Sequence, residues 1–135
     1  MTVIPYASAQ SDTSGGDRPG VEISARQEDP RLNDMAVATA VTDRQPDGAG
    51  DRFPAGTDKL MCWTSVQNLG EPTQVKHTWR HGDRVVSELT LSVGKSRRWR
   101  SWSQQRIPEK LTGTWSCEVT DAAGARLGMA TVTVE

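Results

Sequence analysis

Residues 75–106 read VKHTWRHGDRVVSELTLSVGKSRRWRSWSQQR, and the rest of the chain is arranged around this stretch. Its first half predicts an antiparallel hairpin, because two runs with alternating polar and apolar residues flank a tight turn at Gly82. Residues 92–94 then turn the chain into a third strand that is dense in arginine and tryptophan. We therefore expect a β-rich domain centred on this segment.

Further strand patterns lie on both sides of this segment. Residues 35–41 and 59–66 precede it, and residues 112–119 and 126–134 follow it. Strict alternation in the last run would place Leu127 with Met129, Thr131 and Thr133 on one face, and Ala130, Val132 and Val134 on the other. About seven short strands without a helical period predict an all-β fold, an immunoglobulin-like antiparallel β-sandwich.

The N-terminal residues have a different composition from the rest. Residues 1–34 are rich in Ser, Asp, Gly and Pro, which predicts a flexible arm ahead of a domain at 35–135. Within the arm, an apolar cluster of Val3, Ile4 and Tyr6 is a candidate for strand addition to a partner's sheet. Residues 42–58 are predicted to be a polar connection from which Phe53 plugs the edge of the core.

The overall charge of −1 hides a strong asymmetry along the chain. Residues 1–58 carry a net charge of −5, whereas residues 75–110 carry +6. Such asymmetry indicates an interaction surface or a tail, and the acidic arm could also mask the basic face. No run of 18 apolar residues occurs, so we expect no membrane span.

Two cysteines and a tryptophan follow the spacing by which immunoglobulin-like domains pin their sheets together. Cys62, Trp79 and Cys117 match that order, and Trp115 stands where such domains usually keep a tyrosine. A disulfide between Cys62 and Cys117 would stabilise the fold by about 2–4 kcal/mol in an oxidising compartment. The alternative is two buried free thiols.

The bridge, and small residues at positions 5–10 that resemble an export cleavage site, favour a periplasmic or extracellular location. The cytoplasm is the alternative. No metal site is expected, because His77 and His81 lie four apart on one strand, with Cα atoms roughly 13 Å apart. Neither a Gly-x-Ser-x-Gly elbow, a phosphate-binding loop nor a His-Glu-x-x-His motif occurs, so we expect no catalysis and no cofactor.

The basic, aromatic stretch is the strongest candidate for a binding site. Arginine matches phosphate, sulfate and carboxylate groups, and indoles stack on sugars or bases. The candidate binding residues are Lys95, Arg97, Arg98, Arg100, Trp102 and Arg106. The structural alternative is a tryptophan packing motif with solvated arginines, and the residues expected to be structural are Trp63, His77, Trp79, Trp99 and Trp115.

An ordered set of short motifs carries a family resemblance. These motifs are VTDRQP at 41–46, FPA at 53–55, the strand at 60–66, HxW at 77–79, LxV at 91–93, WRSWS at 99–103, TGxW at 112–115 and VxDxxGxxL at 119–127. Together they resemble an uncharacterised bacterial family, DUF2914, over about residues 36–135. The resemblance implies a compact all-β domain, often in membrane-attached or exported proteins, and implies no activity. Trp102 and Cys117 depart from it, since the family usually has a smaller aromatic and an aliphatic residue there.

We therefore expect a non-catalytic accessory or scaffolding module of the bacterial cell envelope. It would bind another protein, a complex or further copies of itself through its strand edges and N-terminal arm. The alternative is recognition of an anionic glycan or other polyanion by residues 95–106, with acidic polysaccharide ahead of nucleic acid.

Overall fold

The computed structural model describes residues 18–135, which form ten strands and no helix. No helix capable of crossing a membrane is therefore found within that range. The strands are β1 (Val21–Ile23), β2 (Arg31–Thr42), β3 (Gln45–Ala49), β4 (Arg52–Phe53), β5 (Lys59–Asn68), β6 (Thr73–His81), β7 (Arg84–Val93), β8 (Ser96–Arg106), β9 (Gly113–Asp121) and β10 (Arg126–Val134).

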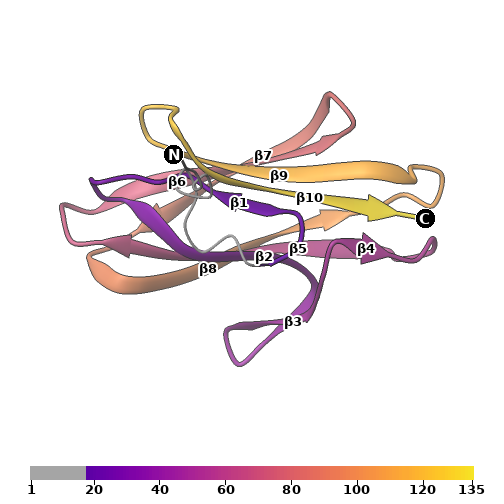
Figure 1. Ribbon diagram of the computed structural model, residues 1–135, viewed down its shortest axis with the longest axis horizontal. Helices are drawn as coiled ribbons and strands as arrows, with labels where there is room; N and C mark the ends of the chain where they lie inside the picture. The colour runs from indigo at the N-terminus through magenta and orange to yellow at the C-terminus, as the bar shows by residue number, and fades with distance from the viewer. Residues whose placement is uncertain (1–17) are drawn as a thin grey trace, which may run out of the picture.

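The strands form two layers that pack face to face (Figure 1). One sheet has the order β1-β10-β9-β6-β7, with the short β4 also pairing with β10, and the other has the order β3-β2-β5-β8. Neighbours in each sheet are mostly far apart in sequence, so the chain crosses repeatedly between the layers. This confirms the predicted all-β sandwich of two mainly antiparallel sheets, although it has ten strands rather than about seven.

Alternating side chains of both sheets fill the core between the layers. Leu60, Cys62 and Val66 point inward from β5, and Trp79 and Trp115 are the largest fully buried side chains. Phe53 enters this cluster from β4, at the position expected for it. The aromatic rings bury the most apolar surface, so they contribute most to holding the layers together.

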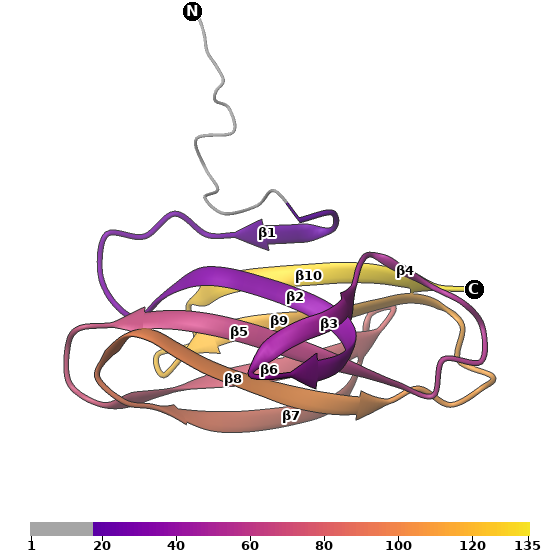
Figure 2. The ribbon, with the colours of Figure 1, turned by 90° about the horizontal axis from the view of Figure 1, so that it is seen from below.

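The domain begins before the boundary predicted at residue 35. β1 runs antiparallel to β10 (Figure 2), in register Val21↔Ala130 and Ile23↔Gly128. Both apolar side chains of β1 are buried. β2 starts at Arg31. A three-residue strand covers an otherwise open sheet edge, and its pattern is too short to be recognised by periodicity.

Residues 42–58 also differ from the predicted polar connection, because they contain β3 and β4. β3 pairs with β2 across a tight turn at Asp43 and Arg44, both with positive φ, and this hairpin projects from the body of the sandwich (Figure 1). Pro46 and Gly48 are residue types typical of turns, which is why the sequence predicts a loop here. An edge strand such as β3 tolerates proline.

A β-bulge changes the expected faces of β10. Arg126 pairs with Thr120 and Gly128 with Val119. Leu127 is therefore an additional residue in β10 that has no pairing partner on β9. The bulge brings Leu127 into the core together with Ala130, Val132 and Val134. The strict alternation predicted for this strand, with Leu127 on the opposite face from these three, is therefore wrong.

Trp115 performs the task that a tyrosine has in related sandwiches. Its Nε1 donates a hydrogen bond of 2.7 Å to the carbonyl of Leu111, four residues upstream. The His81 ring lies 4.9 Å from the indole, and His81 Nε2 lies 2.7 Å from the carbonyl oxygen of Thr112. These contacts tie the β8–β9 connection to the core.

Glu118 links two strands on the outer face of the larger sheet. Its carboxylate accepts hydrogen bonds from Arg80 at 2.9 Å and from Arg126 at 2.7 Å. Burial alone would raise the pKa of Glu118, but the hydrogen bonds and charges of the two guanidinium groups outweigh it and lower that pKa. A carboxyl group with a lowered pKa stabilises the fold above its unfolded-state pKa, and this contribution is lost as the pH falls through the folded-state pKa.

We predict that Glu118→Gln lowers the free energy of unfolding by about 1–2 kcal/mol at neutral pH. The difference from the wild type should shrink as the pH falls from 4.5 through the lowered folded-state pKa of Glu118, because the unfolded chain is protonated first and the native carboxylate only at lower pH. Urea unfolding across this range measures both values. Glu109→Gln removes an exposed charge outside this network and serves as the control. A pH-independent difference would contradict the ionic explanation.

Candidate functional site

The basic, aromatic stretch forms β8, an edge strand of the smaller sheet. β8 pairs only with β5, in a register that runs from Lys59↔Arg106 to Asn68↔Ser96. No strand among residues 18–135 pairs with its other side. An edge strand without a neighbour on one side can pair with a further strand there.

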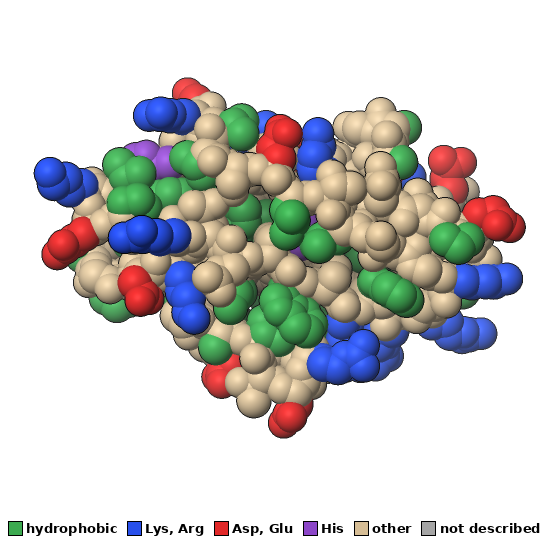
Figure 3. All heavy atoms as spheres, turned by 180° about the vertical axis from the view of Figure 1, so that it is seen from behind, with side chains coloured by type: hydrophobic (Ala, Val, Ile, Leu, Met, Phe, Trp, Pro, Cys, Tyr) green, Lys and Arg blue, Asp and Glu red, His purple; other side chains and the backbone are tan. Residues whose placement is uncertain are grey.

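Alternation divides the side chains of β8 between two environments. Ser103 is opposite Cys62 and points into the core, whereas Arg100 and Trp102 are opposite Ser65 and Trp63 on the outer face. Trp102 remains 37% exposed. On the side of the molecule opposite to Figure 1, hydrophobic side chains lie next to lysine and arginine side chains (Figure 3).

Trp63 is buried, but beneath the β2–β3 turn rather than between the sheets. Its Nε1 donates a 3.0 Å hydrogen bond to the carbonyl of Arg44, and its ring is 3% exposed. It is the register partner of Trp102. The outer face of the smaller sheet therefore has its own indole pair, one ring covered and one accessible.

The bases of this segment have no acidic partners within the described part of the chain. All the ion pairs found there use other bases, such as Arg18 with Asp34 and Arg26 with Asp121. The five unpaired bases are Lys95, Arg97, Arg98, Arg100 and Arg106. In addition, Arg100 Nε is buried without a hydrogen-bond partner. The edge thus combines open backbone groups with unneutralised positive charge.

Trp99 is more accessible than the structural role expected for it would require. It is opposite Val66 but lies at the rim of the sandwich, where it is 37% exposed. A Cβ atom at Gly94 would lie 2.8 Å from its ring, so this glycine permits the close packing. Trp99 forms one wall of a shallow groove with Thr73, Val93 and other residues at this end.

Cys62 and Cys117 face each other between the sheets, on β5 and β9, but both are free and buried. The predicted disulfide is therefore not present. The imidazole of His77 on β6 lies beside them, and one ligand atom from each of the three residues lies within 4.8 Å of the other two. The sulfur atoms thus belong to a three-residue cluster rather than to a bonded pair.

Hydrogen bonds fix the orientation of this cluster. The Ser103 hydroxyl lies 2.7 Å from His77 Nδ1 and accepts a hydrogen bond of 3.1 Å from Trp79 Nε1. His77 Nε2 is buried and has no hydrogen-bond partner. Burial raises the pKa of a thiol, yet the hydrogen bond from Cys117 and the nearby imidazole outweigh it and lower the pKa of Cys62 to about 6. Burial and the neighbouring Cys62 raise the pKa of Cys117.

The position of His77 relative to Trp79 indicates this cluster in the sequence, whereas the spacing between His77 and His81 does not. His77 and His81 do lie too far apart along β6 to share a ligand, but His77 occupies the same inward face as Trp79. β9 continues this inward face beside β6 in the same sheet, and β5 lies across the core from it, so both cysteines lie near His77.

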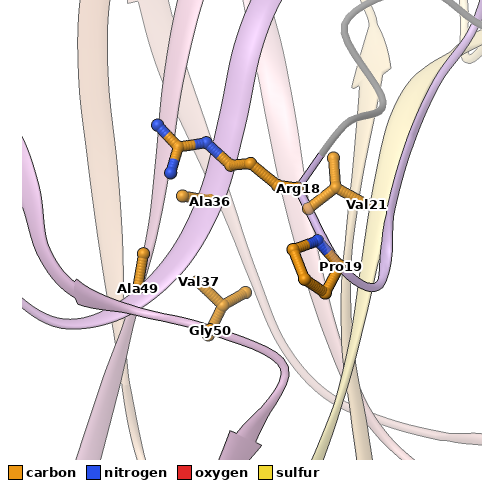
Figure 4. A pocket seen from close by; sticks show the side chains of 7 residues that line it. All are labelled: Arg18, Pro19, Val21, Ala36, Val37, Ala49 and Gly50. Atoms are coloured by element: carbon orange, nitrogen blue, oxygen red, sulfur yellow. The ribbon is translucent and has the colours of Figure 1, made fainter.

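A small cavity lies between the β1 end of the chain and the smaller sheet (Figure 4). It measures about 50 Å³ and is lined mainly by Pro19, Val21, Ala36 and Val37. Arg18 at its rim is bound to Asp34. The volume suits a few water molecules and is well below the roughly 300 Å³ of a typical ligand site. Val3, Ile4 and Tyr6 of the predicted partner arm lie outside the described residues.

Comparison with protein families identifies the segment that carries β6 to β10. Residues 72–134 match the family "Protein of unknown function (DUF2914)". The predicted resemblance to DUF2914 is confirmed for these residues. The match includes β8, His77 and Cys117, whereas Cys62 lies upstream of the DUF2914 segment.

None of the curated proteins matches the chain. Among solved structures, the chain is similar to an engineered protein whose crystal structure is known, with 20% sequence identity and a TM-score of 0.43. The similarity covers 88% of this chain and 22% of the engineered protein, so this chain spans less than a quarter of that protein's length.

Proposed function

We propose that this domain is a non-catalytic binding module that docks a protein partner at the edge strand β8. The observation that supports this most directly is the combination on β8 of an open edge and bases that have no acidic partner among residues 18–135. An extended acidic segment of the partner would add to the sheet as a further strand. Backbone hydrogen bonds then provide affinity, and the arginines select carboxylates.

The sign of the charge also bears on which partner fits. Edge strands are often protected against self-association by charged side chains. Bases of one sign on β8 repel the β8 of a second copy but attract an acidic segment. The charge therefore favours a different protein over self-assembly through this edge.

The proposed role is that of an accessory or scaffolding module in the bacterial cell envelope, periplasmic or extracellular. The resemblance to DUF2914, whose members are often exported or membrane-attached, supports this location. The N-terminal arm, with Val3, Ile4 and Tyr6, stays part of the proposal as a second contact with the partner.

A second candidate function is recognition of an anionic polysaccharide. The half-exposed indole of Trp99 in the wall of a groove favours it, because indole faces stack on sugar rings. Arg97 and Arg98 lie next to Trp99 in sequence and could bind sulfate or carboxylate groups of the same chain.

We predict that Arg97→Ala/Arg98→Ala weakens partner capture about tenfold or more, since losing about 1.4 kcal/mol of binding energy already has that effect. A photo-crosslinking residue replaces Gln104, which is exposed on β8, and the crosslinked product is followed in the native host. The control Arg84→Ala/Lys110→Ala removes the same charge elsewhere and should leave the product unchanged. The same probe at Thr90 on β7 should give no product.

Two outcomes would decide against the protein partner. Equal crosslinking from Gln104 and Thr90 would show that β8 has no special role. The polysaccharide candidate would be established instead by two results together. The protein would bind heparin, with Arg97→Ala/Arg98→Ala abolishing that binding and Arg84→Ala/Lys110→Ala preserving it. The crosslinker at Gln104 would also give no product.

A further inference from the structure

We propose that Cys62, His77 and Cys117 form a binding site for a thiophilic closed-shell metal ion, Zn²⁺ or Cu⁺, within the core. Their ligand atoms lie within 4.8 Å of one another, and all three side chains are fully buried. This inference is independent of the docking proposed for β8. It concerns the space between the sheets rather than the strand edge.

The distances are close to those that a metal ion would require. Zinc binds thiolate sulfur at about 2.3 Å and imidazole nitrogen at about 2.0–2.1 Å, which places ligand atoms roughly 3.5–4 Å apart. From separations of at most 4.8 Å, the three ligand atoms therefore need to approach one another by at most about 1.3 Å. Small rotations of side chains suffice, because each ligand projects inward from the central part of a strand.

The free nitrogen of His77 is the second observation that points to a ligand. Nδ1 is engaged by the Ser103 hydroxyl, while Nε2 is buried and has no partner. An unsatisfied polar atom in a dry core costs about 1–3 kcal/mol, and a metal bond at Nε2 would remove that cost. A metal-bound histidine commonly has its other nitrogen held by a hydrogen bond, which is the role that Ser103 fills here.

The ligand set defines the class of metal. Thiolates select Zn²⁺ and Cu⁺ over hard ions such as Mg²⁺ and Ca²⁺. Two thiolates and a neutral imidazole cancel the charge of Zn²⁺, which favours zinc in a buried site. Three ligands without a fourth suit Cu⁺, because structural zinc sites usually have four. Refolding with equal amounts of Zn²⁺ and Cu⁺, followed by metal analysis, shows which of the two ions the site prefers.

The position of the site determines how the ion would be acquired. Both sheets cover the cluster, and Cys62 and Cys117 are fully buried, so the folded chain gives an ion no direct path. Metal binding is then coupled to folding, as in other structural sites. The ion should enter during refolding and should exchange slowly afterwards.

The test uses the full chain, unfolded and reduced in the presence of a chelator, then refolded with one equivalent of Zn²⁺, Co²⁺ as its spectroscopic substitute, or Cu⁺. We expect about one ion per chain after gel filtration, with thiolate-to-cobalt charge-transfer absorption. X-ray absorption of the loaded wild-type protein should show two sulfur ligands and one nitrogen ligand. Since this measurement needs no variant, it remains decisive if substitutions prevent folding.

Variants then assign the ligands. His77→Gln and Cys62→Ala should lose the bound ion, Ser103→Ala should weaken binding about 10–100-fold, and His81→Gln should keep it. Retention of the ion by His77→Gln, or a wild-type chain that refolds without taking up either ion, would overturn the proposal. So would a Cys62–Cys117 disulfide in protein isolated from its host, detected as a mass lower by two hydrogens.

Discussion

Replacing Trp79 by alanine is expected to lower the free energy of unfolding by about 3–5 kcal/mol. The ring is 1% exposed and lies on β6 beside Cys117 of β9, at the centre of the space between the sheets. Its Nε1 donates to Ser103 on the opposite sheet, so the substitution also removes a hydrogen bond between the layers. Because a domain of this size has a total stability of about 5–15 kcal/mol, the variant should be partly unfolded at modest temperature.

Trp102→Ala is the matched control for this prediction. It deletes the same side chain from the outer face of the smaller sheet, where the ring is 37% exposed. We expect a loss of less than about 1 kcal/mol, as is usual for surface positions. Urea unfolding followed by circular dichroism measures both variants. Equal losses would show that the two indoles contribute alike, which would contradict the core described above.

Leu127→Ala should cost about 2–5 kcal/mol, because the side chain is completely buried and its removal leaves a cavity. Leu127 reaches the core only through the β-bulge between Arg126 and Gly128. Regular alternation would place it with Met129, on the opposite face from Ala130. The size of the loss therefore tests the bulge itself.

Met129→Ala provides the comparison, since Met129 is the partly exposed residue two positions away. Its truncation should cost about 1 kcal/mol or less. Thermal and urea unfolding of the two variants give the difference directly. A larger loss at Met129 than at Leu127 would mean that β10 runs in the register expected from simple alternation.

The two proposals made for this domain both involve β8, the metal site through its inward-facing Ser103 and the docking through its free edge. Along β8, Ser103 points inward to His77 and Trp79, whereas Arg100 and Trp102 point outward. Variants at Arg97 and Arg98 leave the metal ligands untouched, so the two proposals can be tested separately.

Much of the architecture follows from the sequence by itself. Alternation of apolar residues predicts the strands from β5 to β10, because side chains on successive residues of a strand point to opposite faces. Trp79 is a large side chain that lies between Cys62 and Cys117 in the sequence, and this arrangement predicts the core of a sandwich. The run of bases from Lys95 to Arg106 marks the candidate binding strand without reference to any other part of the chain.

Other features depend on contacts that no local pattern encodes. β1 is stable only because β10 offers it an edge, and Leu127 is buried only because a bulge shifts the register. Trp99 is half-exposed because it lies in the wall of an open groove beside Thr73 and Val93 of the opposite sheet. Cys62, His77 and Cys117 come from three strands in two sheets, so only the packing of those sheets brings their ligand atoms together.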